Sequence, residues 1–447
     1  IYTLWHTLSL HDALPILKKI VKMGGSDKLW EDLVAFDENN KSDWNFLGPD
    51  HFLCGEEALN IEAIKLALLE MCDAAGIDLL LDTRAVAAIG SDVKEYDIKR
   101  GLAELPDSNI PELLISRAGG AIVEHYSGRG AIIAKYVIDA SANGIMSWWL
   151  GGKEGCIVNP PTKRGLTQSY VWIGGVDMDK LVEWVLNLPD GTFEMYPSDA
   201  NQLRAHVETG RLIWFKSKGM NQPAEVFEKA DEQEDLDILF KSGFTPVGFY
   251  FKWVGRYPKH GLFAVDGPYY REDSLDGKVW TSEHTRNLYG SWGLYRIMRH
   301  MPGFEKAYLD RTCERMGLRT TRVPIGLYTI TGDDLRVNKE HPDAVGVADW
   351  HDRTKEGDTG KWGYHVPLRA LISRSIDGLS FCARAVSFGP GAMNAHRGIG
   401  TTIVCGQGAG VATAVALATH KELREVDHKM VKELLKQQDV VLDIPKL

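Results

Sequence analysis

The sequence of 447 residues contains no closely spaced pair of cysteines. Zinc sites and iron–sulfur clusters need paired cysteines such as CxxC, and small secreted proteins need dense disulfide frameworks. The absence of such pairs predicts no metal site, and it favours a cytoplasmic protein with reduced thiols. The cysteines are scattered along the chain: Cys54, Cys72, Cys156, Cys313, Cys382 and Cys405.

Long charged runs and long apolar runs are also missing. The net charge is −10 and is spread without acidic or basic blocks, which argues against nucleic acid or an anionic membrane as a partner. No uninterrupted apolar run reaches the roughly 18 residues of a membrane span. There is no HExxH, P-loop or GxSxG motif, so the signatures of zinc proteases, P-loop NTPases and serine hydrolases are absent.

The first 16 residues, IYTLWHTLSLHDALPI, lack an initiator Met and the basic start of a signal peptide. They resemble translated adapter sequence from assembled environmental DNA, so we exclude them from the fold. We expect the gene to be truncated at its 5′ end. Any export signal would have been on the lost end, which leaves the cellular location unknown.

The rest of the chain has the composition of a large globular protein, with 44% hydrophobic and 25% charged residues. Residues 60–76 predict a helix and residues 77–89 a strand. A hairpin that turns at residues 127–130 leads to a buried strand over 135–140. This strand ends in Ala140, Ser141 and Ala142, whose small size lets a ligand approach the backbone, unless they are a plain exit from the strand.

The sequence pattern changes between residues 155 and 349. Aromatic and polar residues alternate there, which predicts a mostly antiparallel sheet. Trp172, Trp214, Tyr250 and Trp253 could stack on a substrate ring or belong to the core. After residue 350 the pattern is α/β again, with a strand over 379–387 and helices over 404–423 and 427–438. We therefore predict a nucleotide-binding domain, 17–154 and 350–447, split by a substrate domain, 155–349.

The stretch RGIGTTIVCGQGAGVATAVALA, residues 397–418, is the most distinctive in the chain. It fails the dinucleotide pattern GxGxxG, because Gly406, Gly408 and Gly410 give GxGxG. Two interpretations stay open. The glycines could allow close helix packing, or N–H groups at Gly406–Gly408 could form a helix start that stabilises negative charge on a reduced flavin.

Several stretches, in order and spacing, resemble a family of FAD-dependent oxidoreductases that includes heterodisulfide reductase A-like flavoproteins. Residues 397–410 resemble its pattern Arg-x-x-Gly-Thr followed by Gly-Gln-Ala-Ala-Gly. AKYVIDASANG, residues 134–144, resembles its strand end Ile-Asp-Ala-Thr-Gly-Asp. LRTTRVPIGLYTITGDDL, residues 318–335, resembles its segment Arg-x-Ser-Arg-Arg-x-x-Gly-x-Tyr. Residues 60–86, 364–372 and 379–387 also agree.

The sequence departs from the family at a few positions. The opening strand, GxGxxG loop and helix that hold the FAD diphosphate are absent. Ser141 and Ala142 stand where Thr-Gly is usual, Asn143 stands for Asp, and Val323 replaces an arginine. The cysteines that bind an iron–sulfur cluster in larger relatives are also absent, so a cluster relay is not supported.

The resemblance implies an α/β fold, namely a split glutathione-reductase-like FAD-binding domain that lacks its first βαβ unit, with an inserted α+β substrate domain. It also implies that FAD is the cofactor. The residues that it places at the cofactor are Val86, Ala140, Ser141, Ala142, Arg384, Gly400, Thr401, Gly406, Gln407 and Gly408. The alternative for Arg384 is a surface salt bridge.

The implied activity is that of a dehydrogenase, which transfers hydride between an unknown small organic substrate and flavin N5 and uses an unknown electron acceptor. His396 and Arg397 are expected to polarise a carbonyl or accept a proton, unless His396 is a packing residue. Arg322, with Arg319, could bind a carboxylate or form an interdomain ion pair. His365 is a weaker candidate of the same kind.

Two other functions stay open. The chain could be a catalytically silent body that only binds a substrate or partner, because its diphosphate loop is missing. It could also be a flavin hydroxylase, which NAD(P)H use or rapid peroxide formation would reveal. The presence of a flavin absorbance band distinguishes an enzyme from a silent body.

Overall fold

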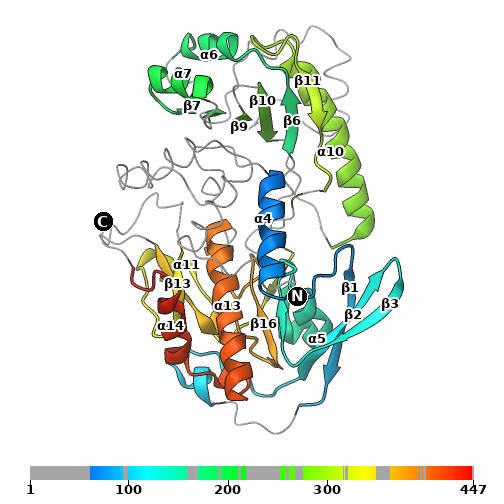
Figure 1. Ribbon diagram of the computed structural model, residues 1–447, viewed down its shortest axis with the longest axis vertical. Helices are drawn as coiled ribbons and strands as arrows, with labels where there is room; N and C mark the ends of the chain where they lie inside the picture. Colours follow the sequence, from blue (N-terminus) through cyan, green and yellow to red (C-terminus); the bar gives the residue numbers. More distant parts are fainter. Residues whose placement is uncertain are drawn as a thin grey trace. The chain divides into compact units, whose positions relative to one another are not determined.

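The structure is a computed structural model. It describes residues 61–93, 99–158, 170–189, 193–209, 213–217, 252–257, 261–266, 275–315, 317, 321–348, 363–389, 391–392, 395 and 399–444. The chain forms two compact units (Figure 1). Unit 1 contains the described residues of Asn60–Thr162 and Arg322–Leu447, and unit 2 contains those of Lys163–Thr321.

Unit 1 begins with a helix and an antiparallel sheet. The predicted first helix is confirmed as α4 (Ile61–Ala74), and Gly76 follows it with a φ of +64°. The next strand starts later than predicted, because the turn at Asp82, φ +49°, interrupts the extended chain. The sheet contains β1 (Arg84–Ser91), β2 (Ser116–His125), β3 (Gly128–Ile133) and the short parallel strand β15 (Ile376–Asp377).

The hairpin between β2 and β3 turns earlier than predicted. His125 pairs with Gly128, so the turn is Tyr126–Ser127. Gly128 has a φ of +115° and begins β3 directly. The glycines of the predicted turn therefore belong to the strand, where their register is fixed by pairing with β2.

Two short strand pairs complete the centre of unit 1. The strand β4 (Val137–Asp139) pairs in parallel with β16 (Leu379–Phe381), and these two strands come from the two sequence segments of the unit. After β4 the chain enters α5 (Ile145–Gly155) and β5 (Cys156–Val158). The strand β5 pairs antiparallel with β12 (Arg322–Pro324). The single-turn helix η3 (Gly101–Glu104) lies between β1 and β2 in sequence.

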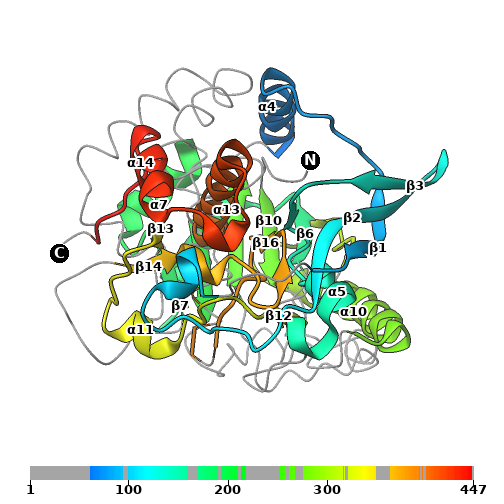
Figure 2. The same cartoon turned by 90° about the horizontal axis from the view of Figure 1, so that it is seen from below.

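The C-terminal segment forms the main core of unit 1. It contains α11 (Gly332–Arg336), β13 (Ala344–Ala348), β14 (Tyr364–Pro367) and the turn η5 (Leu368–Ala370). The long apolar helix α13 (Ile399–Thr419) packs on β13, β16 and α14 (Figure 2). The turn η6 (Leu423–Glu425) leads to α14 (His428–Gln437), whose predicted cap is confirmed because the Asp427 side chain accepts a hydrogen bond from Lys429 N.

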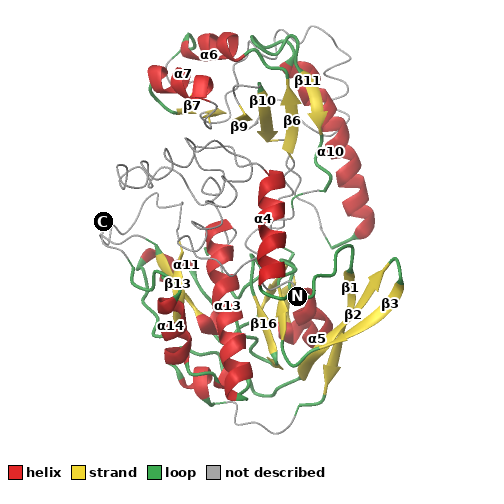
Figure 3. Cartoon of the chain, in the orientation of Figure 1, coloured by secondary structure: helices red, strands yellow, loops and turns green. Residues whose placement is uncertain are grey.

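Unit 2 is an antiparallel sheet with helices, as predicted from the aromatic segment (Figure 3). The strand order is β11 (Tyr308–Arg311), β6 (Tyr170–Gly174), β10 (Leu262–Asp266), β9 (Lys252–Tyr257), β8 (Ile213–Ser217) and β7 (Phe193–Tyr196). The helices are α6 (Met178–Leu186), α7 (Ala200–Thr209) and α10 (Gly277–Met298). Val171 and Ile173 of β6 and Phe263 of β10 pack with Leu181 of α6 and Leu294 of α10 in one apolar core.

The boundaries of unit 2 differ from those predicted from the sequence. The predicted substrate domain, 155–349, includes β5, β12, α11 and β13, whereas these elements belong to unit 1. The physical reason is pairing and packing. The strand β12 pairs with β5, and β13 pairs with β14 and contacts α13. Segment 322–348 therefore has its partners in unit 1.

Candidate functional site

The parallel strands β4 and β16 end at the same edge, and each runs into a loop with a residue at positive φ. Ala142 follows β4 with a φ of +62°, and Ala383 follows β16 with a φ of +63°. A left-handed conformation costs an alanine about 1 kcal/mol or more, so the surrounding contacts must hold both loops. Ligands in α/β proteins bind outside the carboxyl ends of parallel strands, which makes this edge the candidate site.

Asp139, the last residue of β4, organises the first of these loops. The residue is only 4% exposed. Its Oδ1 accepts a hydrogen bond from Ser141 N at 2.9 Å, and its Oδ2 accepts one from Met146 N at 3.0 Å. Its backbone carbonyl accepts a hydrogen bond from Cys382 N at 3.1 Å. The carboxylate thus folds the loop back and caps α5, whose N-cap residue, Gly144, has no side chain.

Arg384 joins the two loops. Its Nε donates a hydrogen bond to the carbonyl oxygen of Ala142 at 3.4 Å. The structure therefore brings together Arg384 and the segment Ala140–Ala142, which the sequence analysis placed at one site. Ser141 is exposed, whereas Ala140, Ala142 and Arg384 are half-buried. A cation and small side chains thus lie at the carboxyl ends of β4 and β16.

Arg322 lies at the start of β12, beside α5. Its guanidinium carbon is 5.5 Å from the centre of the Trp148 ring, a cation–π distance. Its Nε is buried and has no hydrogen-bond partner in the described part of the chain. Burial raises the pKa of the nearby Cys156 thiol to about 12, and the positive charge of Arg322 offsets only part of this rise. Arg322 thus has a buried donor that no described residue satisfies.

The helix start predicted at Gly406–Gly408 is wrong. The helix α13 begins at Ile399, so Gly406 is its eighth residue, and the N–H groups of residues 406–408 bond within the helix. Gly408 is a packing position instead, because a Cβ atom there would lie 2.6 Å from the Val345 Cβ of β13. For Gly408, the structure favours close helix packing.

Two polar residues of α13 bond within the protein. Thr401, which is buried, donates a hydrogen bond from Oγ1 to the carbonyl of Ala395 at 3.2 Å. Gln407 donates from Nε2 to Gln438 Oε1 at 2.9 Å. Between them, the Cys405 thiol is fully buried, which raises its pKa, and the neighbouring Cys382 adds to this rise. The first half of α13 therefore lies near the end of β16, where Cys382 directly follows Phe381.

Other predicted site residues lie elsewhere or outside the described residues. Val86 is a bulge residue of β1, between the pairs that Ala85 and Ala87 form with β2. Gly400 is the second residue of α13. His365 is buried in β14, where its Nδ1 accepts a hydrogen bond from His341 N at 2.9 Å, and burial lowers its pKa. His396, Arg397, Arg319 and Tyr250 are outside the described residues.

Two of the predicted aromatic residues, Trp172 and Trp214, lie on the face of the unit 2 sheet opposite to its apolar core. Trp172 alternates with the core residues Val171 and Ile173, so it points to the opposite face. The Arg311 guanidinium carbon lies 4.6 Å from the Trp172 ring centre. Trp214 alternates in the same way in β8 and is buried. Their role in substrate binding remains a prediction.

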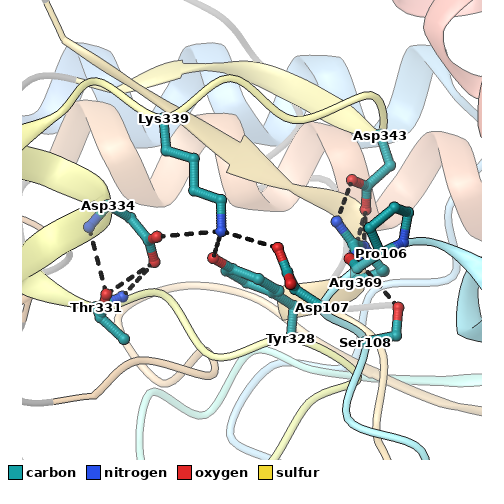
Figure 4. Close-up of polar contacts among 9 residues, drawn as sticks. All are labelled: Pro106, Asp107, Ser108, Tyr328, Thr331, Asp334, Lys339, Asp343 and Arg369. Carbon is teal, nitrogen blue, oxygen red and sulfur yellow. Dashed lines mark hydrogen bonds and ion pairs between the residues drawn. The ribbon is translucent and has the colours of Figure 1, made fainter.

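A polar cluster that the sequence analysis missed surrounds Tyr328 (Figure 4). Lys339 donates hydrogen bonds from Nζ to Tyr328 Oη at 2.9 Å and to Asp107 Oδ2 at 3.2 Å. Asp334 completes the cluster, with an ion pair to Lys339 at 3.5 Å and a capping box with Thr331. All three donor positions of the ammonium group are thus occupied, so this cluster holds the chain together rather than offering a ligand site.

Next to this cluster lies a buried ion pair between Arg369 and Asp343. Arg369 donates from Nε to Asp343 Oδ2 at 3.0 Å and from Nη2 to Oδ1 at 3.1 Å. Its Nη1 reaches the carbonyl of Pro106 and Ser108 Oγ (Figure 4). The pair therefore fixes the loop after η3 to the core. The sequence signal for it is weak, because its partners are far apart along the chain.

Among the described residues, no group of three or more His, Cys, Asp or Glu side chains could hold a metal ion. One helix segment, Thr401–Thr419, is long and apolar enough to cross a membrane by length and composition, and 61% of it is buried inside the protein. The core helix of a globular protein passes the same test.

Comparisons with known proteins identify a family. Residues 17–435 match the model of a family described as FAD dependent oxidoreductase. No curated protein gives a significant match. Four chains of solved structures match. One is a geranylgeranyl bacteriochlorophyll reductase-like protein from Thermoplasma acidophilum, with 14% identity and a TM-score of 0.35; the alignment covers 85% of this chain and 60% of that one. The chain thus spans less than two thirds of that protein.

Proposed function

The chain belongs to the FAD dependent oxidoreductase family, and we propose that it is a dehydrogenase that transfers hydride between a small organic substrate and N5 of FAD. The order of its motifs supports a subtype similar to the heterodisulfide reductase A-like flavoproteins. It also supports a split glutathione-reductase-like arrangement of unit 1. FAD supplies the two-electron redox chemistry, and the chain supplies binding, orientation and charge.

The observation that carries the proposal is the contact between Arg384 and the Ala142 carbonyl. It joins two loops at the carboxyl ends of parallel strands, the usual ligand position in such folds. The residues fit a flavin there. The small side chains of Ala140 and Ala142 let a flat ring approach the backbone, and Arg384 supplies positive charge for an electron-rich ring edge.

We assign the substrate side to Arg322. The buried Nε without a partner among the described residues and the stacking on Trp148 leave a guanidinium that can bind a substrate carboxylate. In this proposal, His396 or Arg397 moves or stabilises a proton on the substrate; both roles rest on the motif alone. The substrate is therefore expected to be a small molecule with an anionic group.

The direct test is FAD binding by the purified full chain. We expect the protein to bind added FAD in a titration, although weakly because the GxGxxG loop is absent from the sequence, with a flavin absorbance band that disappears when a substrate reduces the flavin without oxygen. A colourless protein that refuses FAD would contradict the proposal and favour a silent binding body. NAD(P)H consumption with rapid peroxide formation would instead favour a flavin hydroxylase.

The site itself is tested by a pair of arginine variants. Arg384→Met should weaken FAD binding about tenfold, because it removes the cation and the bond to the Ala142 loop. Arg374→Met is the matched control, since Arg374 is also half-buried and its ion pair with Glu154 is long, at 4.0 Å. Equal FAD affinities of the two variants would place the cofactor elsewhere.

A further inference from the structure

We propose that Asp139 is a positioning residue whose carboxylate holds the loop Ala140–Gly144 in the conformation that this loop presents to FAD. The inference rests on the proposed function and extends it to a residue that does not itself contact the ring. Asp139 was absent from the site predicted from the sequence. In the sequence it is an acid at the end of an otherwise apolar strand, inside the stretch that resembles Ile-Asp-Ala-Thr-Gly-Asp, but no role was assigned to it.

The carboxylate of Asp139 is bonded to both ends of the loop. Its two oxygens accept hydrogen bonds from N–H groups two and seven residues further along the chain, those of Ser141 and Met146. Both ends of the loop are therefore tied to one buried group. Bonds to an ionised acceptor are about twice as strong as neutral ones, so this carboxylate restrains the loop more than a turn alone would.

The bonds to Asp139 maintain backbone strain at Ala142. Ala142 adopts a φ of +62°, although it is not a glycine, and Gly144 follows with +59°. A free loop of this sequence would relax to negative φ at Ala142. In this conformation the carbonyl of Ala142 accepts the Arg384 hydrogen bond. Asp139 thus holds the loop in the conformation in which it contacts the Arg384 guanidinium.

The backbone of Asp139 also bonds to the chain at the end of the neighbouring strand, β16. The Asp139 carbonyl accepts a hydrogen bond from Cys382 N, so the same residue sets the alignment of β4 and β16 at the edge where both loops begin. Backbone and side chain of one residue therefore fix both loops of the proposed cofactor site.

The test compares two buried strand-end aspartates. Asp139→Asn puts an amide NH₂ against one of the two backbone N–H groups, so we expect about tenfold weaker FAD binding by the folded protein. Asp377→Asn is the matched control. Asp377 ends β15, is also buried, and its ion pair with Arg424 at 2.9 Å does not involve this loop. It should lower stability but leave the FAD affinity unchanged.

The readouts are FAD affinity, from quenching of flavin fluorescence, and the unfolding midpoint without FAD. A merely structural role of Asp139 would lower the midpoint of both variants and leave both affinities alike, which would overturn the inference. Wild-type protein that does not bind FAD would instead contradict the proposed function. The two failures are therefore distinguishable.

A second pair of variants covers the case in which Asp139→Asn does not fold. Ala142→Gly adopts the positive φ without strain and puts the residue usual in the family at this position, so it should keep both the unfolding midpoint and the FAD affinity. Ala142→Val makes the positive φ costlier, so we expect weaker FAD binding by the folded protein. Equal FAD affinities of these two variants would contradict the idea that the loop conformation matters.

Discussion

At the scale of single residues, Asp343 and Arg369 are almost completely withdrawn from water, with side chains 0% and 2% exposed. A buried ion pair of this kind stabilises the fold only while each charge keeps its oppositely charged partner. Asp343→Asn leaves the guanidinium buried beside a neutral amide, so we expect the free energy of unfolding to fall by about 3–5 kcal/mol. Urea denaturation followed by circular dichroism measures this loss.

The control for this prediction is an exposed pair of the same chemistry. Asp333 pairs with Arg336 across one turn of α11, and its side chain is 80% exposed. Asp333→Asn should change the free energy of unfolding by less than about 1 kcal/mol. Similar losses in the two variants would mean that burial does not govern the strength of the first pair.

His341 gives unit 1 a sensitivity to acid. Its pKa is lowered from 6.5 to about 4, chiefly by burial; Asp343 opposes the shift, and the charges of Arg369 and Lys339 contribute to it. Below pH 6.5 the His341 imidazole is protonated in the unfolded chain, whereas in the folded chain it stays neutral until the pH approaches 4. Stability is therefore fully present above pH 6.5 and is lost as the pH falls toward 4, by about 3 kcal/mol.

The measurement is a series of urea titrations between pH 7 and pH 4. His341→Gln removes the titrating ring, so its stability should fall less over this range than that of the wild type. His420→Gln removes an exposed histidine after α13 and serves as the control for the loss of an imidazole as such. Parallel curves for wild type and His341→Gln would contradict the assignment.

The candidate site was predictable only in part, and the residues show why. Ala140–Ala142 and Arg384 follow apolar strands, so their motifs are visible in the sequence, and the structure joins them. Asp139 and Arg369 are single polar residues inside apolar stretches. Their roles depend on partners that the fold brings near, such as Met146 and Asp343, and no local pattern announces these contacts.

At the scale of elements, the contact of α13 with β13 explains a glycine that looks unfavourable in a helix. Gly408→Ala would normally favour a helix by about 1 kcal/mol. Here the new methyl group would lie 2.6 Å from Val345, which is buried and β-branched. We expect a net loss of about 1–3 kcal/mol in the free energy of unfolding.

Two further variants test whether the loss comes from the contact with Val345. Gly277→Ala changes a glycine at the start of α10 that has nothing nearby, so it should be neutral or stabilising. Val345→Ala introduced together with Gly408→Ala should recover part of the loss, because it removes Cγ1 and Cγ2, two of the three Val345 atoms that would lie within 3.0 Å of the added methyl group. Additive losses in the double variant would show that the two side chains do not compete for the same space.

Helices with strong local signals were predicted well, whereas the start of α13 was not. The helices α4 and α14 carry apolar periodicity, and α14 has an aspartate cap, so short-range physics determines them. The first turns of α13 are rich in glycine, which favours turns, and in β-branched residues, which favour strands. Packing on β13 and β16 overrides this preference, and packing is invisible in one sequence.

At the scale of the whole chain, the antiparallel sheet of unit 2 was predictable because its strands alternate in polarity. The boundaries of the unit were not. They depend on which strands pair across a long interval of sequence, and the strand β12 is only three residues long. Its pairing with β5 places Val158 and Arg322 opposite each other as Cα partners. The chain thus leaves unit 1 and returns to it at adjacent positions.

This adjacency predicts that unit 1 folds without unit 2. Replacing residues 159–321 by the turn Asn-Gly should close a hairpin between Val158 and Arg322, since two-residue loops of this kind connect antiparallel partners. We expect cooperative urea unfolding and near-ultraviolet circular dichroism of a packed core. The control deletes 155–349, the domain predicted from the sequence. It removes Asp343, Val345 and the partner strands of unit 1, so it should stay unfolded; a folded control, or an unfolded first variant, would contradict the structural boundary.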